Sequence, residues 1–408
     1  MSEGPSFRPA KPWGWVIRAV QTFLRFDLAR RNRLHLDPHD LAVLMALPQG
    51  AGIVLTPNHA DETDFKACLD LARRSGRRFL FMMNREAFDE GYGVAGWWLQ
   101  RLGAFSVERG GPHNEEAKRY AVEVVMRGRE VLVIFPEGEI YYLNDLVQPF
   151  KSGAVDIGMQ AVVEARKARA DWTAYLVPVA FKYRYRRPII PILERRTRVM
   201  EQYLDIRIAG LSLQQRLSQI MADLLRRQEL AHHLRPAADR LTDLGERVQE
   251  VRQAILSQAE ARYAGAAASP QALTMDRAWR LSSRLRALLT RSGSSGAQDR
   301  EQARTDLASS ESVAKMAGWQ PQYTEGDPSQ ERLAETVIKL EREVYGTKRP
   351  RQLAGRDLFI RIGEPIDLGR SIPDYLRDAQ AVRRILAERL RDEIQRLLEP
   401  AAPTGTGP

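Results

Sequence analysis

The chain has 408 residues, of which 44% are hydrophobic, and its formal net charge is +10. This length and apolar content predict a globular protein of two or three units. The single cysteine, Cys68, excludes an internal disulfide and is expected to be a buried helix residue. No leader-like segment and no apolar run of about 18 residues is recognisable, so we expect a cytoplasmic protein that meets a bilayer only from its surface.

The positive charge is concentrated in two short stretches. Residues 7–36 contain seven Arg or Lys side chains and one acidic residue, and residues 182–198 contain the same numbers. Such clusters favour an anionic partner, although a solvated rim is the other interpretation of residues 182–198. Neither stretch carries a nucleic-acid reader motif or a repeated aromatic platform, so we expect a membrane surface with anionic lipid and no nucleic acid.

Residues 1–37 are predicted to form a basic amphipathic helix. Its apolar positions recur at intervals of three and four, and arginines occupy the other side: Trp13, Ile17, Val20, Leu24 and Leu28. One interpretation is a helix that packs on the protein's own core. The other is a helix in the membrane plane, with Trp at the headgroups and Arg near anionic lipid.

Residues 38–198 alternate between short apolar runs and helical periods, which is typical of an α/β fold. The predicted strands are GIVLTP, FLFMM, AFSVE, VLVIFP and AYLVPVAF. We therefore expect a mostly parallel central sheet flanked by helices, with ligands bound at the carboxyl ends of its strands.

Residues 199–348 are predicted to be a large α-helical insertion, because leucines and valines mark single apolar seams there. A packed subdomain without chemistry and an arm that forms a homodimer both fit these seams. The paired His232 and His233 are expected on a solvated helix face. Residues 349–399 return to the core with a strand and a C-terminal helix, and residues 400–408 are expected to be a disordered tail.

His59 and Asp64, in PNHADETDF, are the candidate catalytic pair. Within one continuous helix, five residues rotate by about 140°, so the two side chains could meet only if a helix begins between them. Asp61 is a suitable N-cap for such a helix. Asp64 could then hold the Nδ1 proton of His59 and leave Nε2 to accept a proton. The spacing alone is not diagnostic, since His35 and Asp40 share it, and a capping loop is the other interpretation.

Two further blocks follow predicted strands. Gly103, Phe105 and Arg109 occupy LGAFSVERGG, where an arginine beside flexible backbone suits phosphate capture, although a lone arginine is more often solvated. In VLVIFPEG, proline fixes the chain direction and Gly138 permits positive φ. Glu137 is therefore expected to be held at the sheet edge.

Two single residues complete the set. Lys151, in FKSGA, precedes a predicted helix start and is a suitable anion contact. Pro178 lies in the last predicted strand of the α/β region. No metal site is expected, because no cluster of ligands accompanies the histidines.

The order of these blocks resembles the glycerolipid acyltransferases that include lysophosphatidate acyltransferase. That family carries His-x-x-x-x-Asp, Gly-x-x-x-x-x-Arg, Phe-Pro-Glu-Gly and Val-Pro in turn, and this chain shows NHADETD, GAFSVER, FPEG and LVPVAF. The resemblance covers residues 50–185 and 355–370. It implies acyl transfer from a thioester, on coenzyme A or a carrier protein, to a lysophospholipid hydroxyl, without a cofactor or a covalent intermediate.

The resemblance also implies roles for the residues. His59 would be the general base, Asp64 its orienting carboxylate, and Arg109 the phosphate ligand. Gly103 and Phe105 would shape a turn, Glu137 and Gly138 would hold the acceptor, and Pro178 would line the acyl channel.

One block departs from the family. Thr-Arg-Ser usually follows Phe-Pro-Glu-Gly, whereas this chain has Glu139, Ile140 and Tyr141. Either Arg109 and Lys151 bind the phosphate instead, or the acceptor is not ordinary lysophosphatidate. A catalytically silent lipid-binding scaffold with the same fold is the alternative function.

Overall fold

The computed structural model describes residues 7–111, 114–206, 210–234, 244–263, 273–290 and 297–399. They form two compact units. The sheet unit contains the described parts of Phe7–Val107, His113–Arg186 and Gly355–Pro408. The helical unit contains those of Glu108–Pro112 and Arg187–Ala354. The predicted tail, residues 400–408, lies outside the described residues.

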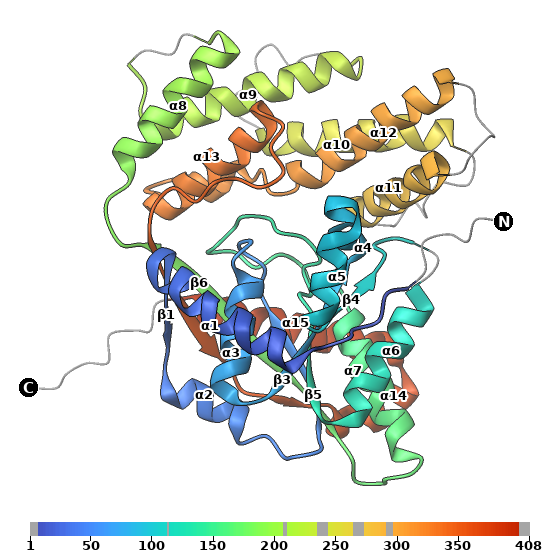
Figure 1. Cartoon of the computed structure of the whole chain (residues 1–408). Helices are drawn as coiled ribbons and strands as arrows, with labels where there is room; N and C mark the ends of the chain where they lie inside the picture. Colours follow the sequence, from blue (N-terminus) through green and yellow to red (C-terminus); the bar gives the residue numbers. More distant parts are fainter. Residues whose placement is uncertain are drawn as a thin grey trace, which may run out of the picture. The chain divides into compact units, whose positions relative to one another are not determined.

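The sheet unit alternates strands and helices along the chain (Figure 1). Its elements are α1 (Gly14–Arg31), β1 (Asn32–Leu36), α2 (Pro38–Met45), β2 (Gly52–Pro57), α3 (Asp64–Ser75), β3 (Arg78–Asn84), α4 (Arg85–Asp89), η1 (Glu90–Gly93), α5 (Val94–Arg101), β4 (Ala104–Val107), α6 (Asn114–Arg127), β5 (Glu130–Val133), α7 (Gly153–Arg166), β6 (Ala174–Tyr185), β7 (Arg356–Ile362), β8 (Ile366–Asp367), η3 (Leu368–Ser371), α14 (Ile372–Arg377) and α15 (Ala379–Leu398).

The strands form one sheet in the order β1-β7-β6-β2-β5-β3-β4, and β8 pairs with β6. Among the described residues, five strand pairings are parallel, and the pairings of β6 with β7 and with β8 are antiparallel. The prediction of a mostly parallel sheet flanked by helices is therefore confirmed.

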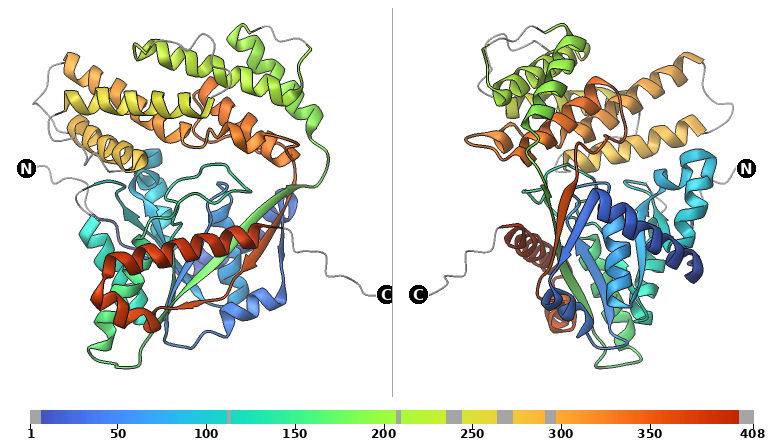
Figure 2. Two further views of the ribbon diagram at one scale, coloured as in Figure 1. Left: turned by 180° about the vertical axis from the view of Figure 1, so that it is seen from behind. Right: turned by 60° about the vertical axis from the view of Figure 1, so that its left-hand side comes forward.

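Both faces of the sheet are covered, because the side chains of each strand alternate between two apolar clusters. In β2, Ile53 and Leu55 join the cluster that contains α1, α2 and α3. Val54 joins the cluster on the opposite face, with α6, α7 and α15. Figure 2 shows α15 crossing that face. Cys68 is buried within α3, as predicted.

The N-terminal helix is packed on the sheet unit. Leu24 and Leu28 of the predicted apolar stripe are buried, and the Gln21 amide donates to the Leu69 carbonyl at 3.0 Å. Leu24 and Leu28 therefore face the protein's own core, which was one of the two interpretations, whereas Trp13 of the same stripe is exposed. The outward face of the helix carries Trp15 and Phe26, which are exposed and were not part of the predicted stripe.

Three predicted boundaries are wrong. Residues 32–36 are not part of the N-terminal helix but form β1, which pairs with β7 and so belongs to the sheet. The helical unit begins at Arg187 rather than at residue 199, and it ends at Ala354 rather than at residue 348. Two prolines explain why the helical unit begins before residue 199: Pro188 follows the end of β6, and Pro191 lies in the first turn of the next helix. The second basic stretch is thus divided between the two units.

The helical unit contains α8 (Ile190–Leu204), α9 (Leu213–Ala231), α10 (Leu244–Arg262), α11 (Thr274–Thr290), α12 (Ala297–Met316), η2 (Pro321–Thr324) and α13 (Gln330–Val344). The predicted seams are buried within this unit, as Ile220, Val251 and Val337 illustrate. One chain therefore covers these seams by itself. A homodimer through this unit would need another surface and stays a prediction.

Two asparagine side chains extend the hydrogen bonding of β6 beyond the end of β2. The Asn58 amide donates to the Phe181 carbonyl at 3.1 Å and accepts from the Phe181 N–H at 2.7 Å. The Asn144 amide makes the same two bonds with Tyr183, at 3.0 and 2.6 Å. Both asparagines are buried. They take the place of a neighbouring strand and fix the loops that follow β2 and β5.

We predict that Asn58→Leu lowers the free energy of unfolding by about 2–4 kcal/mol, because a buried N–H and a buried carbonyl lose their partners. Guanidinium denaturation of the full chain measures this loss. Asn144→Leu should cost a similar amount. A loss below about 0.5 kcal/mol, the usual effect of a surface substitution, would contradict the proposed role of the amides.

Candidate active site

His59 and Asp64 lie between the end of β2 and the first turn of α3. The Nδ1 atom of His59 is 2.9 Å from Oδ2 of Asp64. Asp64 is completely buried, whereas the His59 side chain is 19% exposed. The imidazole stacks on Phe135, with 4.1 Å between ring centroids. Because Asp64 engages Nδ1, the nitrogen available to accept a proton is Nε2.

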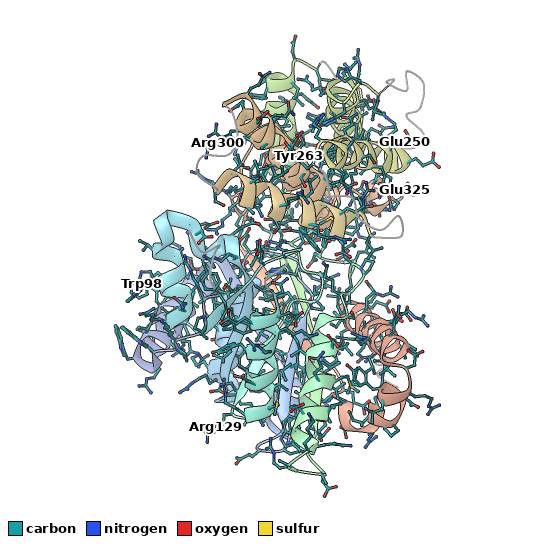
Figure 3. The ribbon with its side chains drawn as sticks, turned by 90° about the vertical axis from the view of Figure 1, so that its right-hand side faces the viewer. Trp98, Arg129, Glu250, Tyr263, Arg300 and Glu325 are labelled. Atoms are coloured by element: carbon teal, nitrogen blue, oxygen red, sulfur yellow. The ribbon has the colours of Figure 1, made fainter. Side chains whose placement is uncertain are left out.

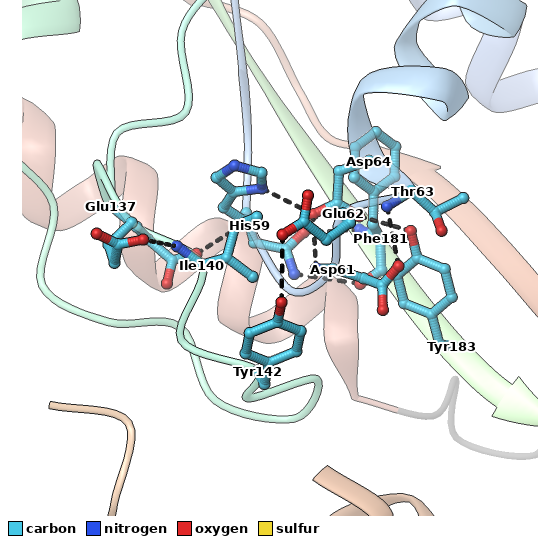
Figure 4. A network of polar contacts seen from close by, with 12 residues as sticks. His59, Asp61, Glu62, Thr63, Asp64, Glu137, Ile140, Tyr142, Phe181 and Tyr183 are labelled. Atoms are coloured by element: carbon cyan, nitrogen blue, oxygen red, sulfur yellow. Dashed lines mark hydrogen bonds and ion pairs between the residues drawn. The ribbon is translucent and has the colours of Figure 1, made fainter. Parts of the chain in front are cut away.

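The turn between the two residues has the geometry that the spacing requires. Helix α3 begins at Asp64, so His59 precedes the helix as predicted. The Asp61 carboxylate accepts the Thr63 N–H at 2.9 Å, and the Asp61 N–H donates to Asp64 Oδ2 at 2.9 Å. The N-cap is Thr63 rather than Asp61. Asp61 instead stabilises the turn that returns the chain to Asp64 (Figure 4).

The second His-x-x-x-x-Asp match does not form a pair. His35 lies in β1, and its Nε2 is 3.0 Å from Asp357 in β7. Asp40 lies in α2 and is 3.4 Å from the Arg361 guanidinium. Helix α2 also begins between His35 and Asp40, so neither the spacing nor a helix start is sufficient to bring a histidine and an aspartate together.

Glu137 holds the histidine loop in place. Its Oε1 accepts the His59 N–H at 2.7 Å, and its Oε2 accepts the Gln148 N–H at 3.3 Å. Burial raises the pKa of Glu137 to about 7, although the bond from His59 opposes the shift. Gly138 has φ 73°, so it supplies the predicted positive φ. The Glu137 carboxylate therefore contacts the backbone of the candidate base, His59.

The altered segment after Glu137 and Gly138 is largely buried. Tyr142 is 2% exposed and adopts φ 52°. Its hydroxyl donates to Glu62 at 3.3 Å (Figure 4). Glu139 accepts the Ile140 N–H at 3.1 Å. In the position of the family's Thr-Arg-Ser the chain thus has a loop that is packed by tyrosines.

The remaining predicted residues of the sheet unit have mainly structural contacts. Gly103 has φ 96°, and a Cβ atom at this position would lie 2.9 Å from the Phe79 carbonyl oxygen, so only glycine fits this turn. Phe105 is buried against Tyr120. Pro178 is buried in β6 opposite Thr56. Lys151 is exposed, and its N–H donates to the Pro136 carbonyl at 2.9 Å, directly before α7.

Arg109 belongs to the helical unit. Its guanidinium lies over the Trp279 ring of α11, at 5.6 Å. Neighbouring Glu108 accepts a hydrogen bond from Ser283 at 2.5 Å. The structure therefore brings His59, Asp64 and Glu137 together within the sheet unit. Arg109 belongs to the helical unit and packs on α11 of that same unit.

Two residues of the network have no signal in the sequence. The Tyr183 hydroxyl donates to Asp64 Oδ1 at 2.5 Å. The Arg356 guanidinium forms two bonds with Asp61, at 2.9 and 3.0 Å. Burial tends to raise the pKa of Asp61, but Arg356 lowers it below the ordinary value. These residues are 119 and 295 positions from their partners, and no short motif contains such pairs.

No metal centre is found among the residues that the structure describes, since none of their His, Cys, Asp and Glu side chains form a group of three or more around one point. His232, at the end of α9, instead contacts the Gln258 side chain at 3.0 Å.

The raised pKa of Glu137 predicts a pH-dependent stability. The ordinary value is 4.5 and the value in the protein about 7, so the folded chain binds this proton more tightly. The resulting stabilisation is complete below about pH 4.5 and is lost as the pH rises through about 7. Glu137→Gln should lack this part of the decline in the free energy of unfolding, as measured by denaturation from pH 4 to 8. Parallel curves for both proteins would contradict this prediction, and Glu164→Gln is the charge-matched surface control.

Comparisons with known proteins match the part of the chain that contains these residues. Residues 43–182 match the family model described as Acyltransferase. Over 106 residues the chain is 32% identical to the 1-acyl-sn-glycerol-3-phosphate acyltransferase of Streptococcus pneumoniae, a match that covers 26% of this chain and 35% of that protein. The chain thus spans about a third of the length of this curated relative. Residues 43–182, which contain His59, Asp64 and Glu137, therefore match an acyltransferase domain.

Proposed function

We propose that this protein is a phospholipid-biosynthetic O-acyltransferase. It moves a fatty acyl group from an acyl thioester, on coenzyme A or an acyl carrier protein, to the hydroxyl of a lysophosphatidate-like acceptor. The observation that carries the proposal is the 2.9 Å contact between His59 Nδ1 and the buried Asp64 carboxylate. This arrangement leaves a partly exposed imidazole with one nitrogen directed to a substrate.

The proposed reaction needs one base and no covalent intermediate. Nε2 of His59 takes the proton of the acceptor hydroxyl while that oxygen attacks the thioester carbonyl carbon. Asp64 stabilises the imidazolium that forms, because its carboxylate faces Nδ1. The carbon–sulfur bond then breaks, and the leaving thiolate receives the proton from His59. The products are the acylated lipid and the free thiol.

The phosphate of the acceptor is assigned to Lys151 and Arg109. The backbone of Lys151 is bonded to Pro136, so its position depends on the same loop as Glu137. Arg109 lies in the helical unit, and its part in phosphate binding is proposed from its place in the GAFSVER block alone. The relative from Streptococcus pneumoniae is named for 1-acyl-sn-glycerol-3-phosphate, which supports a lysophosphatidate-like acceptor here.

A catalytically silent lipid-binding scaffold is the second candidate function. The observation in its favour is the tyrosine-packed loop at residues 139–144, where the family usually has Thr-Arg-Ser. Against it, the complete set of donors around Asp64 has no evident use in a protein that only binds lipid.

The enzyme proposal predicts that His59→Ala lowers kcat for acyl transfer by at least about 100-fold, because a positioned general base contributes about 10²–10⁴-fold. The assay follows transfer from a labelled acyl thioester to a panel of lysophospholipids. Lysolipid binding should not change, because the imidazole acts on the proton and not on the headgroup.

His35→Gln is the matched control, since His35 belongs to the other motif with the same spacing and should be dispensable. The scaffold would be favoured if the wild-type protein bound lysolipid but transferred no acyl group to any acceptor from either class of donor. Full activity of His59→Ala would contradict the proposed base.

We further propose that the sheet unit attaches peripherally to the cytoplasmic leaflet of a membrane. None of the described helices is both long and apolar enough to cross a bilayer. The attachment is assigned to the aromatic surface, defined as the exposed apolar side chains of α1 and α5 with Trp13: Trp13, Trp15, Phe23, Phe26, Val94, Trp97 and Trp98.

The aromatic surface is continuous between the two helices. Trp13 contacts Trp15 and Trp97, with 5.9 and 5.6 Å between ring centroids. Trp98 projects away from its helix (Figure 3). Trp15, Phe23 and Phe26 lie within about 80° of one another around α1. Exposed arginines flank them at positions 18, 25 and 30. Aromatic side chains with adjacent arginines suit an interface of anionic lipid.

We predict that replacing Trp15, Phe23 and Phe26 together by serine lowers partitioning onto phosphatidylglycerol vesicles by at least about 10-fold, because each buried aromatic contributes about 1.5–3 kcal/mol. Cosedimentation with vesicles measures the partitioning, and binding should weaken with salt. Leu376→Ser with Ile385→Ser, two exposed apolar positions on α14 and α15, is the control. Equal binding by the triple variant and wild type would refute the assignment.

A further inference from the structure

The helical unit is inserted between two adjacent strands that both reach the catalytic loop. The chain leaves the sheet unit after β6 and returns to it at β7. These strands pair in antiparallel register, with Tyr183 opposite Leu358 and Tyr185 opposite Arg356. The Arg186 N–H also donates to the Gly355 carbonyl at 3.1 Å. The two stems of the insertion are therefore joined, and each contributes one buried polar side chain.

From the first stem, Tyr183 holds the catalytic carboxylate. Tyr183 is 3% exposed, and its hydroxyl donates to Asp64 Oδ1 at 2.5 Å. The other oxygen of Asp64 contacts His59 and the Asp61 N–H. Burial, followed by the nearby charge of Asp64, raises the pKa of Tyr183 well above its ordinary value. The hydroxyl consequently stays a donor throughout the neutral range.

From the second stem, Arg356 holds the turn between His59 and Asp64. Besides its two bonds to Asp61, its Nε donates to the Asn32 side chain at 2.9 Å. Its guanidinium also lies over the Tyr183 ring, 4.4 Å from the centroid. Arg356 is 6% exposed. A buried arginine with this many fixed partners defines one geometry for the groups around it.

We propose that Tyr183 and Arg356 are positioning residues for acyl transfer, so that the stems of the helical insertion fix the orientation of the His59 and Asp64 pair. Tyr183 orients the Asp64 carboxylate toward Nδ1 of His59. Arg356 fixes the 61–63 turn and the ring of Tyr183. The inference rests on the proposed function. It gives the two stems of the insertion a part in the reaction.

The charged and titratable groups that face Asp64 come from several elements. They are His59 and Asp61 of its own loop, Cys68 of α3, Glu137 after β5 and Tyr183 of β6, and Arg356 of β7 lies behind Asp61 and Tyr183. Burial raises the pKa of Asp64, and the bonds from His59 and Tyr183 lower it in part. Loss of the tyrosine hydroxyl should therefore raise the pKa of Asp64 further.

Tyr183→Phe is the first test, because it removes the hydroxyl and keeps the ring beneath Arg356. We expect kcat to fall about 10- to 100-fold, the effect of one lost hydrogen bond to a charged group. KM for the thioester should be unchanged, and the acidic limb of the pH–rate profile should move to higher pH. Tyr175→Phe, on the same strand, is the control. A wild-type kcat and pH profile in Tyr183→Phe, together with an inactive His59→Ala, would overturn the inference.

Arg356→Lys and Arg356→Met are the second test. Lysine keeps the charge but loses the paired bonds to Asp61, so it should retain more activity than methionine. If Arg356→Met does not fold, Arg356→Met with Asp61→Asn removes the unpaired charge and takes its place. Arg361→Gln, on the same strand, is the control. Equal activity of the wild type and the Arg356 variants would contradict the role of this side chain.

A spectroscopic measurement separates this inference from the proposed function. ¹⁵N NMR of the histidine rings, assigned by comparison with His59→Ala, reports whether the Nδ1 atom of His59 carries the proton. We expect the Nδ1–H form in the wild type and a mixture of tautomers in Tyr183→Phe. An unchanged tautomer in Tyr183→Phe would refute the positioning role whether or not the protein transfers acyl groups. A wild-type protein without any transfer would instead refute the proposed function.

Discussion

The buried carboxylate of Asp64 is the group on which the geometry of the candidate active site depends. An ionised carboxylate with no exposure to water is unfavourable unless hydrogen-bond donors surround it. Here His59, Tyr183 and the Asp61 N–H supply those donors. The carboxylate in turn fixes the imidazole. The loop after β2 and the end of β6 together place these three donors within hydrogen-bond distance of the two carboxylate oxygens.

The parallel sheet brings these segments together. Strands β2, β5 and β6 are neighbours, so the loops that follow β2 and β5 lie against the last residues of β6. Asn58 and Asn144 bond those loops to the β6 backbone. Glu137 then joins the two loops through the His59 N–H. Each loop is held by side-chain bonds to a strand, which gives the candidate base a fixed position without a regular helix or strand at that point.

Much of this arrangement could be predicted from local patterns. Apolar runs predicted the strands, and a helix start between His59 and Asp64 predicted their contact. The contacts of Tyr183 and Arg356 could not be predicted, because they depend on which strands become neighbours and not on spacing. The apolar stripe of α1 predicted a buried face. The exposure of Trp15 and Phe26 could not be predicted in this way, since an outward aromatic side chain has no periodic signal of its own.

A double-mutant cycle tests the central claim most directly. It compares kcat/KM for acyl transfer in the wild type, His59→Ala, Asp64→Asn and the double variant. If Asp64 acts only through the imidazole, the double variant should be about as slow as His59→Ala alone, because residues that act as one unit are strongly non-additive. Losses that multiply in the double variant would show that the two residues act independently and would contradict the account.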